Sequence, residues 1–281
     1  MLLPSEYFVY KGFCVIEKFD YRREIPSPVC DPHLMKMQAN ESSFPHLSLC
    51  HVKDSTIFVV NLGDTENRMT LGKIERFHEH LSKIEKQEGP KACILVGDGK
   101  FFCNGLDFDE LFTDPSRLLL TFHKLLARLL AFPVPLVAAI NGHAFAGGAM
   151  IALACDFRLM SKARGFLCVN EVDIGLMLTP GMCAVIRAKA DRSLWTPIIL
   201  DGKRFTAEEL LSHRLIEQIA GLDDLLDKAK LLAERVSKRG TTTIIYGALK
   251  KEMYAKELKL LEKGLGYAAD TAKLLAAASK L

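Results

Sequence analysis

One stretch, residues 141–156 with the sequence NGHAFAGGAMIALACD, constrains the fold more than any other part of the chain. It holds three glycines and a run of small residues, and it has no charge before Asp156. Such a segment predicts a loop that another group approaches closely, followed by a helix packed on all sides. We expect the helix to begin near Gly147 and Gly148, where unpartnered N–H groups can face a developing negative charge. The alternative is a tight strand-to-helix turn, and this stretch alone does not decide between the two.

Strand-like and helical segments alternate between residue 47 and about residue 190. Two strand-like runs, 47–52 and 56–61, are separated by a short polar turn and predict a β-hairpin. Alternation of strands and helices implies crossover units with parallel pairing, and so an α/β fold. The segments that follow the hairpin are a helix over 70–86, a buried strand over 92–96, a helix that begins at Asp114-Pro115, and strands over 135–140, 157–160 and 165–169.

The two ends of the chain differ from this central region. Residues 1–46 carry several prolines and no sustained period, which indicates a partly irregular extension with a short hairpin around Lys11-Gly12. Residues 191–281 are mainly helical, with helices expected over 193–200, 206–213, 222–238 and 244–263. We therefore expect an extension over 1–46, a core with the active site over 47–190, and a helical C-terminal region over 191–281.

Composition excludes several classes of protein. The net charge of +3 is spread along the chain without a basic run, which argues against a nucleic-acid partner. The long uncharged run 129–155 is broken by Pro133, Pro135 and the glycines, so we expect no membrane span. The eight cysteines form no C-x-x-C pair and are expected to be reduced and mostly buried. His78 and His80 lie on different faces of a helix, so we expect no metal site.

Two loops offer main-chain donors in successive units of the predicted fold. N–H groups near Leu106 and Gly147 follow neighbouring strands, and converging donors suit a thioester carbonyl whose oxygen gains charge. Removing one such donor typically raises a barrier by about 3 kcal/mol. No nucleophile accompanies them, because Cys103 lacks an obvious base and His143 is expected to be a packed loop residue.

A lone carboxylate follows the strand over 165–169. Glu171 lies at this strand's end, where the crevice of an open α/β sheet tends to form, and a carboxylate in an apolar pocket can take and return a proton. Asp173 is the rival, since alternation along an extended segment would aim both side chains the same way. A solvated acidic loop is the third interpretation.

These motifs resemble those of a known family. Residues 102–107 and 141–156 resemble the two oxyanion-loop motifs of the crotonase, or enoyl-CoA hydratase/isomerase, superfamily. The NEVDIGL sequence over 170–176, with RAK over 187–189, resembles the plant-type peroxisomal Δ3,Δ2-enoyl-CoA isomerases. The resemblance covers residues 47 to about 240. It implies an α/β spiral of ββα units with a helical C-terminal part, an acyl-CoA substrate, no separate cofactor or metal, and a homotrimer or hexamer.

The resemblance also implies roles for individual residues. The amides of Leu106 and Gly147 would form an oxyanion hole, and Glu171 would move a proton from C2 to C4 of a 3-enoyl-CoA through a dienolate. The substrate would be held by residues of the same loops and of the segment before the first helix, namely Arg68, Met69, Asn104, Gly105, Gly148 and Met150.

One departure from the wider family favours isomerisation. Hydratases of this family carry a second glutamate where this chain has Met150, and water addition needs two polar groups to hold and activate water. Double-bond migration needs a single carboxylate. The alternatives are hydration or thioester hydrolysis by the same fold, and an acyl-CoA-binding protein without turnover.

The last three residues predict an address. Ser279-Lys280-Leu281 matches the terminal tripeptide read by the peroxisomal import receptor, so we expect a peroxisomal protein of fatty-acid β-oxidation.

Overall fold

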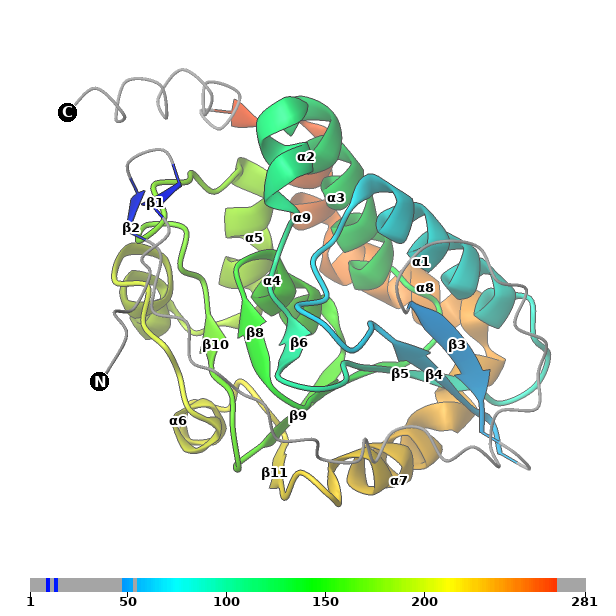
Figure 1. Cartoon of the computed structure of the whole chain (residues 1–281). Helices are drawn as coiled ribbons and strands as arrows, with labels where there is room; N and C mark the ends of the chain where they lie inside the picture. The colour runs from blue at the N-terminus through cyan, green and yellow to red at the C-terminus, as the bar shows by residue number, and fades with distance from the viewer. Residues whose placement is uncertain (1–8, 11–12, 15–46, 53–54, 267–281) are drawn as a thin grey trace.

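The computed structural model describes residues 9–10, 13–14, 47–52 and 55–266 (Figure 1). Strands β1 (Val9–Tyr10) and β2 (Phe13–Cys14) pair antiparallel, as expected for a hairpin around residues 11–12. The rest of the predicted extension and the tripeptide over 279–281 lie outside the described residues.

A six-stranded sheet forms the framework of the molecule. The expected hairpin is confirmed, because β3 pairs antiparallel with β4, and every other neighbouring pair in the sheet is parallel. The strand order is β11-β9-β7-β5-β4-β3. The strands are β3 (Ser48–His51), β4 (Ile57–Asn61), β5 (Ala92–Val96), β7 (Leu136–Ile140), β9 (Phe157–Ser161) and β11 (Gln218–Ala220).

A second, smaller sheet carries the loops of interest. Its strands β6 (Phe101–Cys103), β8 (His143–Phe145) and β10 (Leu167–Cys168) are parallel, in the order β10-β8-β6. The sequence predicted β10 but treated β6 and β8 as loops, because three residues are too few to show a period. The units that begin with β5, β7 and β9 each supply one strand to the large sheet, one to the small sheet and then a helix, whereas both strands of the first unit, β3 and β4, belong to the large sheet. This repeat is the spiral of ββα units that the resemblance implies.

Helix boundaries follow local signals. Thr70 caps α1 (Leu71–Glu85) and Asp114 caps α3 (Pro115–Leu130), each accepting a hydrogen bond from the third residue beyond it, which confirms both predicted helices. The unpredicted α2 (Phe108–Thr113) lies between them. The later α-helices are α4 (Gly147–Ala154), α5 (Pro180–Lys189), α6 (Ala207–Ser212), α7 (Leu225–Ser237), α8 (Thr243–Met253) and α9 (Ala255–Glu262).

Two expected helices are corrected. The segment expected to be one helix over 244–263 breaks at Tyr254, whose amide closes the end of α8. The segment expected over 193–200 forms a 3₁₀ turn, η1 (Arg192–Leu194), and a π turn, η2 (Thr196–Leu200), because Pro197 has no N–H for an α-helical hydrogen bond.

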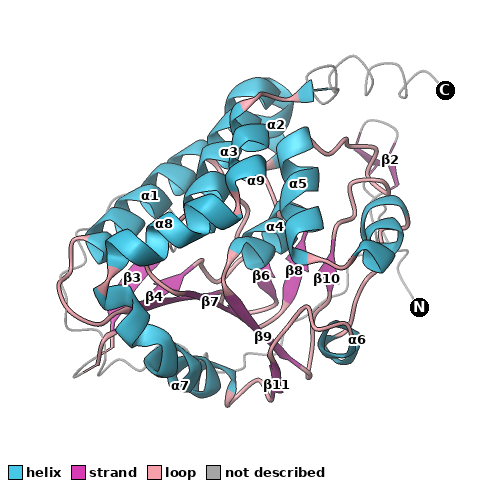
Figure 2. Cartoon of the chain, turned by 180° about the vertical axis from the view of Figure 1, so that it is seen from behind, coloured by secondary structure: helices cyan, strands magenta, loops and turns pink. Residues whose placement is uncertain are grey.

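Helices cover both faces of the large sheet. Figure 2 shows α7 against one face, and α1, α3 and the C-terminal helices α8 and α9 on the other side. Alternating strand residues divide accordingly, so that Ile94 packs towards α7 and Leu95 towards the larger core. Helix α4 lies inside this larger core, with all eight residues buried, as the opening stretch of the sequence predicts.

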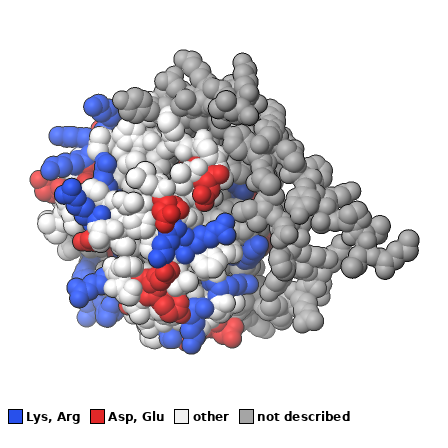
Figure 3. Space-filling model, turned by 90° about the vertical axis from the view of Figure 1, so that its left-hand side faces the viewer, with Lys and Arg blue, Asp and Glu red and all other residues white. Residues whose placement is uncertain are grey.

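The described surface agrees with the charge pattern of the sequence. Basic and acidic side chains are mixed on the face in Figure 3. Within the described ranges no helix has the length and apolar character needed to span a membrane.

Candidate active site

Three loops leave the small sheet at the carboxyl ends of its strands. Because β6, β8 and β10 are parallel, their carboxyl ends point in the same direction. Cys103 of β6 pairs with Ala144 of β8, and Cys168 of β10 pairs with Phe145, the next residue of β8. Leu106, Gly147 and Glu171 each follow these strand ends by two or three residues. The topology therefore brings the three predicted catalytic residues to the same end of the small sheet.

The first loop is fixed by a short bridge to the segment before α1. The Met69 amide donates to the carbonyl of Gly105 at 2.8 Å, and the Asp107 amide donates to the carbonyl of Met69 at 3.1 Å. In a trans peptide the C=O and N–H point in opposite directions, so the Leu106 amide points away from Met69. Arg68 Nη1 also donates to the carbonyls of Asn104 and Leu106, each at 3.2 Å.

The second loop is organised in the same way. The carbonyl of Ala146 accepts from the Met150 amide at 3.2 Å, inside the first turn of α4. The Gly147 amide belongs to the same peptide unit and therefore points out of the helix N-terminus. Among the described residues neither the Leu106 amide nor the Gly147 amide has a protein acceptor, so both donors are free for a ligand oxygen.

The two loops lie in van der Waals contact. A Cβ placed on Gly105 would lie 3.1 Å from the Ala146 Cβ and 3.4 Å from the Gly147 nitrogen, and a Cβ on Gly148 would lie 2.0 Å from the Cys103 carbonyl oxygen. Gly105 also has a φ of +84°, which other residues rarely adopt. These glycines are therefore required by close backbone approach, as the sequence predicts.

Glu171 is the buried carboxylate of the third loop. Its side chain is 8% exposed, and its Oε2 atom has no hydrogen-bond partner within the described structure. Burial raises the pKa of Glu171 to about 7, against the opposing effect of its own backbone N–H. An acid of this pKa can both accept and release a proton near neutral pH.

Glu171 and Asp173, the two candidate carboxylates of the third loop, differ in conformation and burial. The segment after Asn170 is not extended but forms turns, in which the Asp173 and Ile174 amides donate to the Asn170 carbonyl. The expectation that Glu171 and Asp173 point the same way is therefore wrong. Asp173 is exposed while Glu171 is buried, and this difference also excludes the solvated acidic loop for Glu171.

The remaining predicted substrate-binding residues surround the first two loops. Met69 and Met150 are fully buried, and Met150 lies one turn into α4 beyond Gly147. The guanidinium of Arg68 lies 4.4 Å from the ring centre of Phe108 and 2.6 Å from Glu66. The binding roles of these residues stay predictions.

Cys103 and His143, the other reactive side chains considered from the sequence, lie in packed surroundings. Burial raises the pKa of Cys103 to about 11, which keeps it a thiol. His143 packs between aromatic rings at 4.9–5.7 Å, which confirms the expected packing, although the residue lies in β8 and not in a loop. Six cysteines are free, as predicted, namely Cys50, Cys93, Cys103, Cys155, Cys168 and Cys183. Among the described residues no group of three or more His, Cys, Asp or Glu could hold a metal ion.

Comparison with known proteins identifies the family. The model of the enoyl-CoA hydratase/isomerase family matches residues 53–277. The chain belongs to this family. Its fold is the crotonase fold, as predicted, and it is a family enzyme that shares this architecture with solved relatives.

The relatives in this family include enzymes named as isomerases and enzymes named as hydratases. Two are the peroxisomal enoyl-CoA delta isomerases 1 and 2 of Arabidopsis thaliana, 28% and 30% identical over 73% and 72% of this chain and 89% and 90% of their own. The 2,3-dehydroadipyl-CoA hydratase of Escherichia coli is 28% identical over 79% of this chain and 86% of its own. The crystal structure of human mitochondrial delta3-delta2-enoyl-CoA isomerase has a TM-score of 0.72 and 20% identity, over 83% of this chain and 92% of that one.

Proposed function

We propose that this family member is a Δ3,Δ2-enoyl-CoA isomerase. The observation that carries the proposal is that Glu171 is the one buried carboxylate of the three described loops, while α4 has Met150 where the hydratases of the family are expected to carry a second glutamate. Names of the Arabidopsis relatives support the same reaction.

The proposed reaction uses only groups of this chain and the substrate. The Glu171 carboxylate removes a proton from C2 of 3-enoyl-CoA, and the electrons move into the thioester as a dienolate. The amides of Leu106 and Gly147 donate hydrogen bonds to the dienolate oxygen. Protonated Glu171 then returns the proton to C4, which leaves the double bond between C2 and C3. This shuttle requires no cofactor besides the CoA that the substrate carries.

Product analysis tests the proposal. Purified full-length protein should convert 3-cis- or 3-trans-enoyl-CoA to 2-enoyl-CoA, a product of unchanged mass that chromatography separates from its isomer. With 2-enoyl-CoA as substrate it should form no 3-hydroxyacyl-CoA, which is heavier by one water. Hydration, release of free CoA, or binding of acyl-CoA without turnover would each contradict the proposal and identify one of the alternatives.

We also propose that the protein acts as a homotrimer or hexamer. Helix α8 supports this, because Ile245, Leu249 and Met253 recur every four residues on one side and are 60%, 65% and 63% exposed. Light scattering on the full chain should give three or six times the 31.3 kDa protomer mass. Leu249→Glu should shift the mass towards the protomer, and a monomeric wild-type protein would contradict the proposal.

We place the proposed reaction in the peroxisome. Two of the Arabidopsis relatives carry that compartment in their names. A fluorescent fusion that leaves residues 279–281 free should colocalise with a peroxisomal marker.

A further inference from the structure

The residues before the two free amides both have a positive φ. Gly105 precedes the Leu106 amide with a φ of +84°, and Ala146 precedes the Gly147 amide with φ +49° and ψ −122°. The φ and ψ of Ala146 are those of the first central residue of a type II′ turn, a position that glycine dominates because a Cβ is strained there. The chain thus holds alanine where the backbone favours glycine.

Ala146 differs from the other non-glycine residues with positive φ. In the described part of the chain these are Asn67 and Arg214, both at φ +57°. Asparagine adopts this region readily, and Arg214 is an exposed residue outside the three loops. Ala146, in contrast, belongs to the peptide unit whose N–H faces the site.

The strained conformation is held on three sides. The Ala146 amide donates to the carbonyl of Cys168 in β10 at 2.8 Å, and its carbonyl accepts from Met150 in α4 at 3.2 Å. Its methyl group faces Gly105, since a Cβ on Gly105 would lie only 3.1 Å from it. Ala146 therefore contacts β10, which precedes Glu171, α4, which begins at Gly147, and Gly105, which precedes Leu106.

Only one methyl group fits tightly between the two donor loops. With glycine at both 105 and 146 the contact would be lost, and the loops could change their separation. With a Cβ at both positions the contact would be too short for most Cβ pairs. An oxyanion hole depends on a fixed spacing of its donors, because a preorganised donor needs no rearrangement when charge develops.

We propose that Ala146 is a positioning residue, whose strained backbone and methyl group fix the spacing of the Leu106 and Gly147 amides at the cost of fold stability. The inference rests on the proposed function, because it assumes that these two amides bind the thioester oxygen.

Ala146→Gly separates this role from ordinary packing. Relief of the strain should outweigh the greater chain entropy of glycine and raise Tm by about 2–4 °C. Loss of the spacer should lower kcat about tenfold while KM changes less than about threefold, because binding of the ground state depends less on donor placement. If Ala146 served only for packing, Ala146→Gly would instead lower Tm, and kcat would fall together with it.

Two further variants control the experiment. Arg214→Gly changes an exposed positive-φ residue away from the loops and should leave kcat unchanged without lowering Tm. Ala146→Ser restores a Cβ and should return kcat to within about threefold of wild type.

The result that would overturn the inference is a kcat of Ala146→Gly equal to that of the wild type, or a Tm below it. Failure of the proposed function would look different. In that case the wild-type enzyme would not isomerise 3-enoyl-CoA, while the Tm comparison would still apply and kcat would be measured on the acyl-CoA reaction that the wild type does catalyse.

Discussion

Glu171→Gln should lower kcat for conversion of 3-enoyl-CoA to 2-enoyl-CoA by about 10³-fold or more, since general acid–base catalysis by one group contributes about 10²–10⁴-fold and no second carboxylate is proposed to replace it. Glutamine keeps the size of the side chain but cannot carry the proton, so acyl-CoA should still bind with a similar Kd. Steady-state kinetics and calorimetric titration with a saturated acyl-CoA measure the two effects.

Asp173→Asn is the matched control, because Asp173 is the neighbouring carboxylate and is exposed. It should keep kcat within about twofold of wild type. Near-full turnover by Glu171→Gln, or a large loss in Asp173→Asn, would refute the assignment of Glu171 as the proton carrier.

Glu171→Gln should also stabilise the fold at alkaline pH. The pKa of Glu171 is raised to about 7 in the folded protein and lies near 4.5 in the unfolded chain. Between these values the unfolded chain releases a proton that the native state keeps, so the native state loses stability as pH rises, by about 3 kcal/mol once pH exceeds 7. Glu171→Gln removes this loss and should raise Tm at pH 8 but not at pH 4.

The raised pKa also predicts the wild-type activity profile. The ionised carboxylate is the form that abstracts the C2 proton, so kcat/KM should fall about tenfold per pH unit below about 7.

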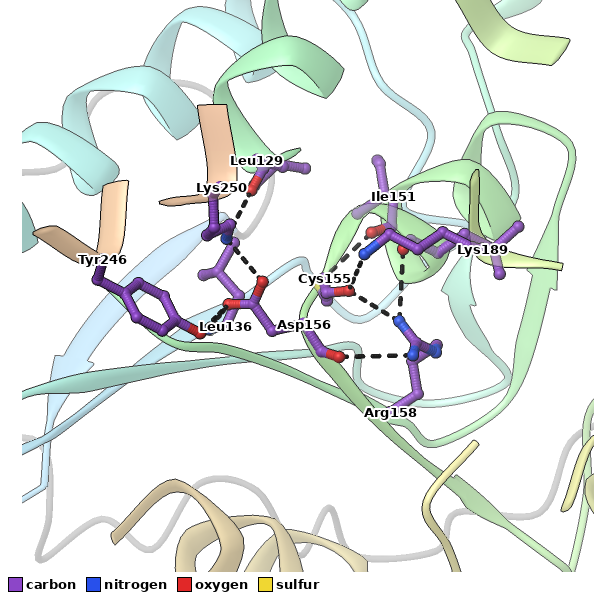
Figure 4. Close-up of polar contacts among 10 residues, drawn as sticks. Leu129, Leu136, Ile151, Cys155, Asp156, Arg158, Lys189, Tyr246 and Lys250 are labelled. Carbon is purple, nitrogen blue, oxygen red and sulfur yellow. Dashed lines mark hydrogen bonds and ion pairs between the residues drawn. The ribbon is translucent and has the colours of Figure 1, made fainter. Parts of the chain in front are cut away.

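Lys250→Met should unfold the protein at a markedly lower temperature. Lys250 Nζ lies 2.7 Å from Asp156 Oδ1, and the two side chains are only 4% and 9% exposed (Figure 4). Removing one partner of a buried ion pair leaves an uncompensated charge, which costs about 3–5 kcal/mol. For a domain of this size Tm should fall by about 6–15 °C in differential scanning calorimetry.

Asp156 makes this loss larger than that of an isolated pair. Its Oδ2 atom accepts from the Leu136 amide at 2.9 Å and from the Tyr246 hydroxyl at 3.1 Å. Burial and the charge of Asp156 raise the pKa of Tyr246, which keeps this hydroxyl a donor. Asp156 thereby joins α8 to the start of β7.

The double variant Asp156→Asn/Lys250→Met provides the control. Asparagine can keep an acceptor for Leu136 but carries no charge that needs Lys250, so the double variant should be more stable than Lys250→Met alone. If Lys250→Met were as stable as the wild type, the ion pair would contribute nothing to the attachment of α8.

Local signals in the sequence determined the order of the elements and identified the glycine-containing loops of the candidate site. Thr70, Asp114 and Pro115 mark helix starts through hydrogen bonds and a fixed φ that span only a few residues. The glycines at 105, 147 and 148 indicate close backbone approach without any knowledge of the approaching group. Such features are readable because their physical cause lies within a few residues of them.

Only the tertiary structure showed that Glu171 is buried while Asp173 is exposed, because the burial and the pKa of a carboxylate depend on residues that are distant in the sequence. The same reason explains why the strained backbone of Ala146 and the pairing of Asp156 with Lys250 could not be predicted. An alanine next to two glycines has no sequence signal for positive φ, since the contacts that hold it come from β10, α4 and the Gly105 loop. The sequence by itself thus determined which loops are candidates for the active site, and the packing of those loops against each other decided which of their carboxylates is buried and which of their amides have no protein acceptor.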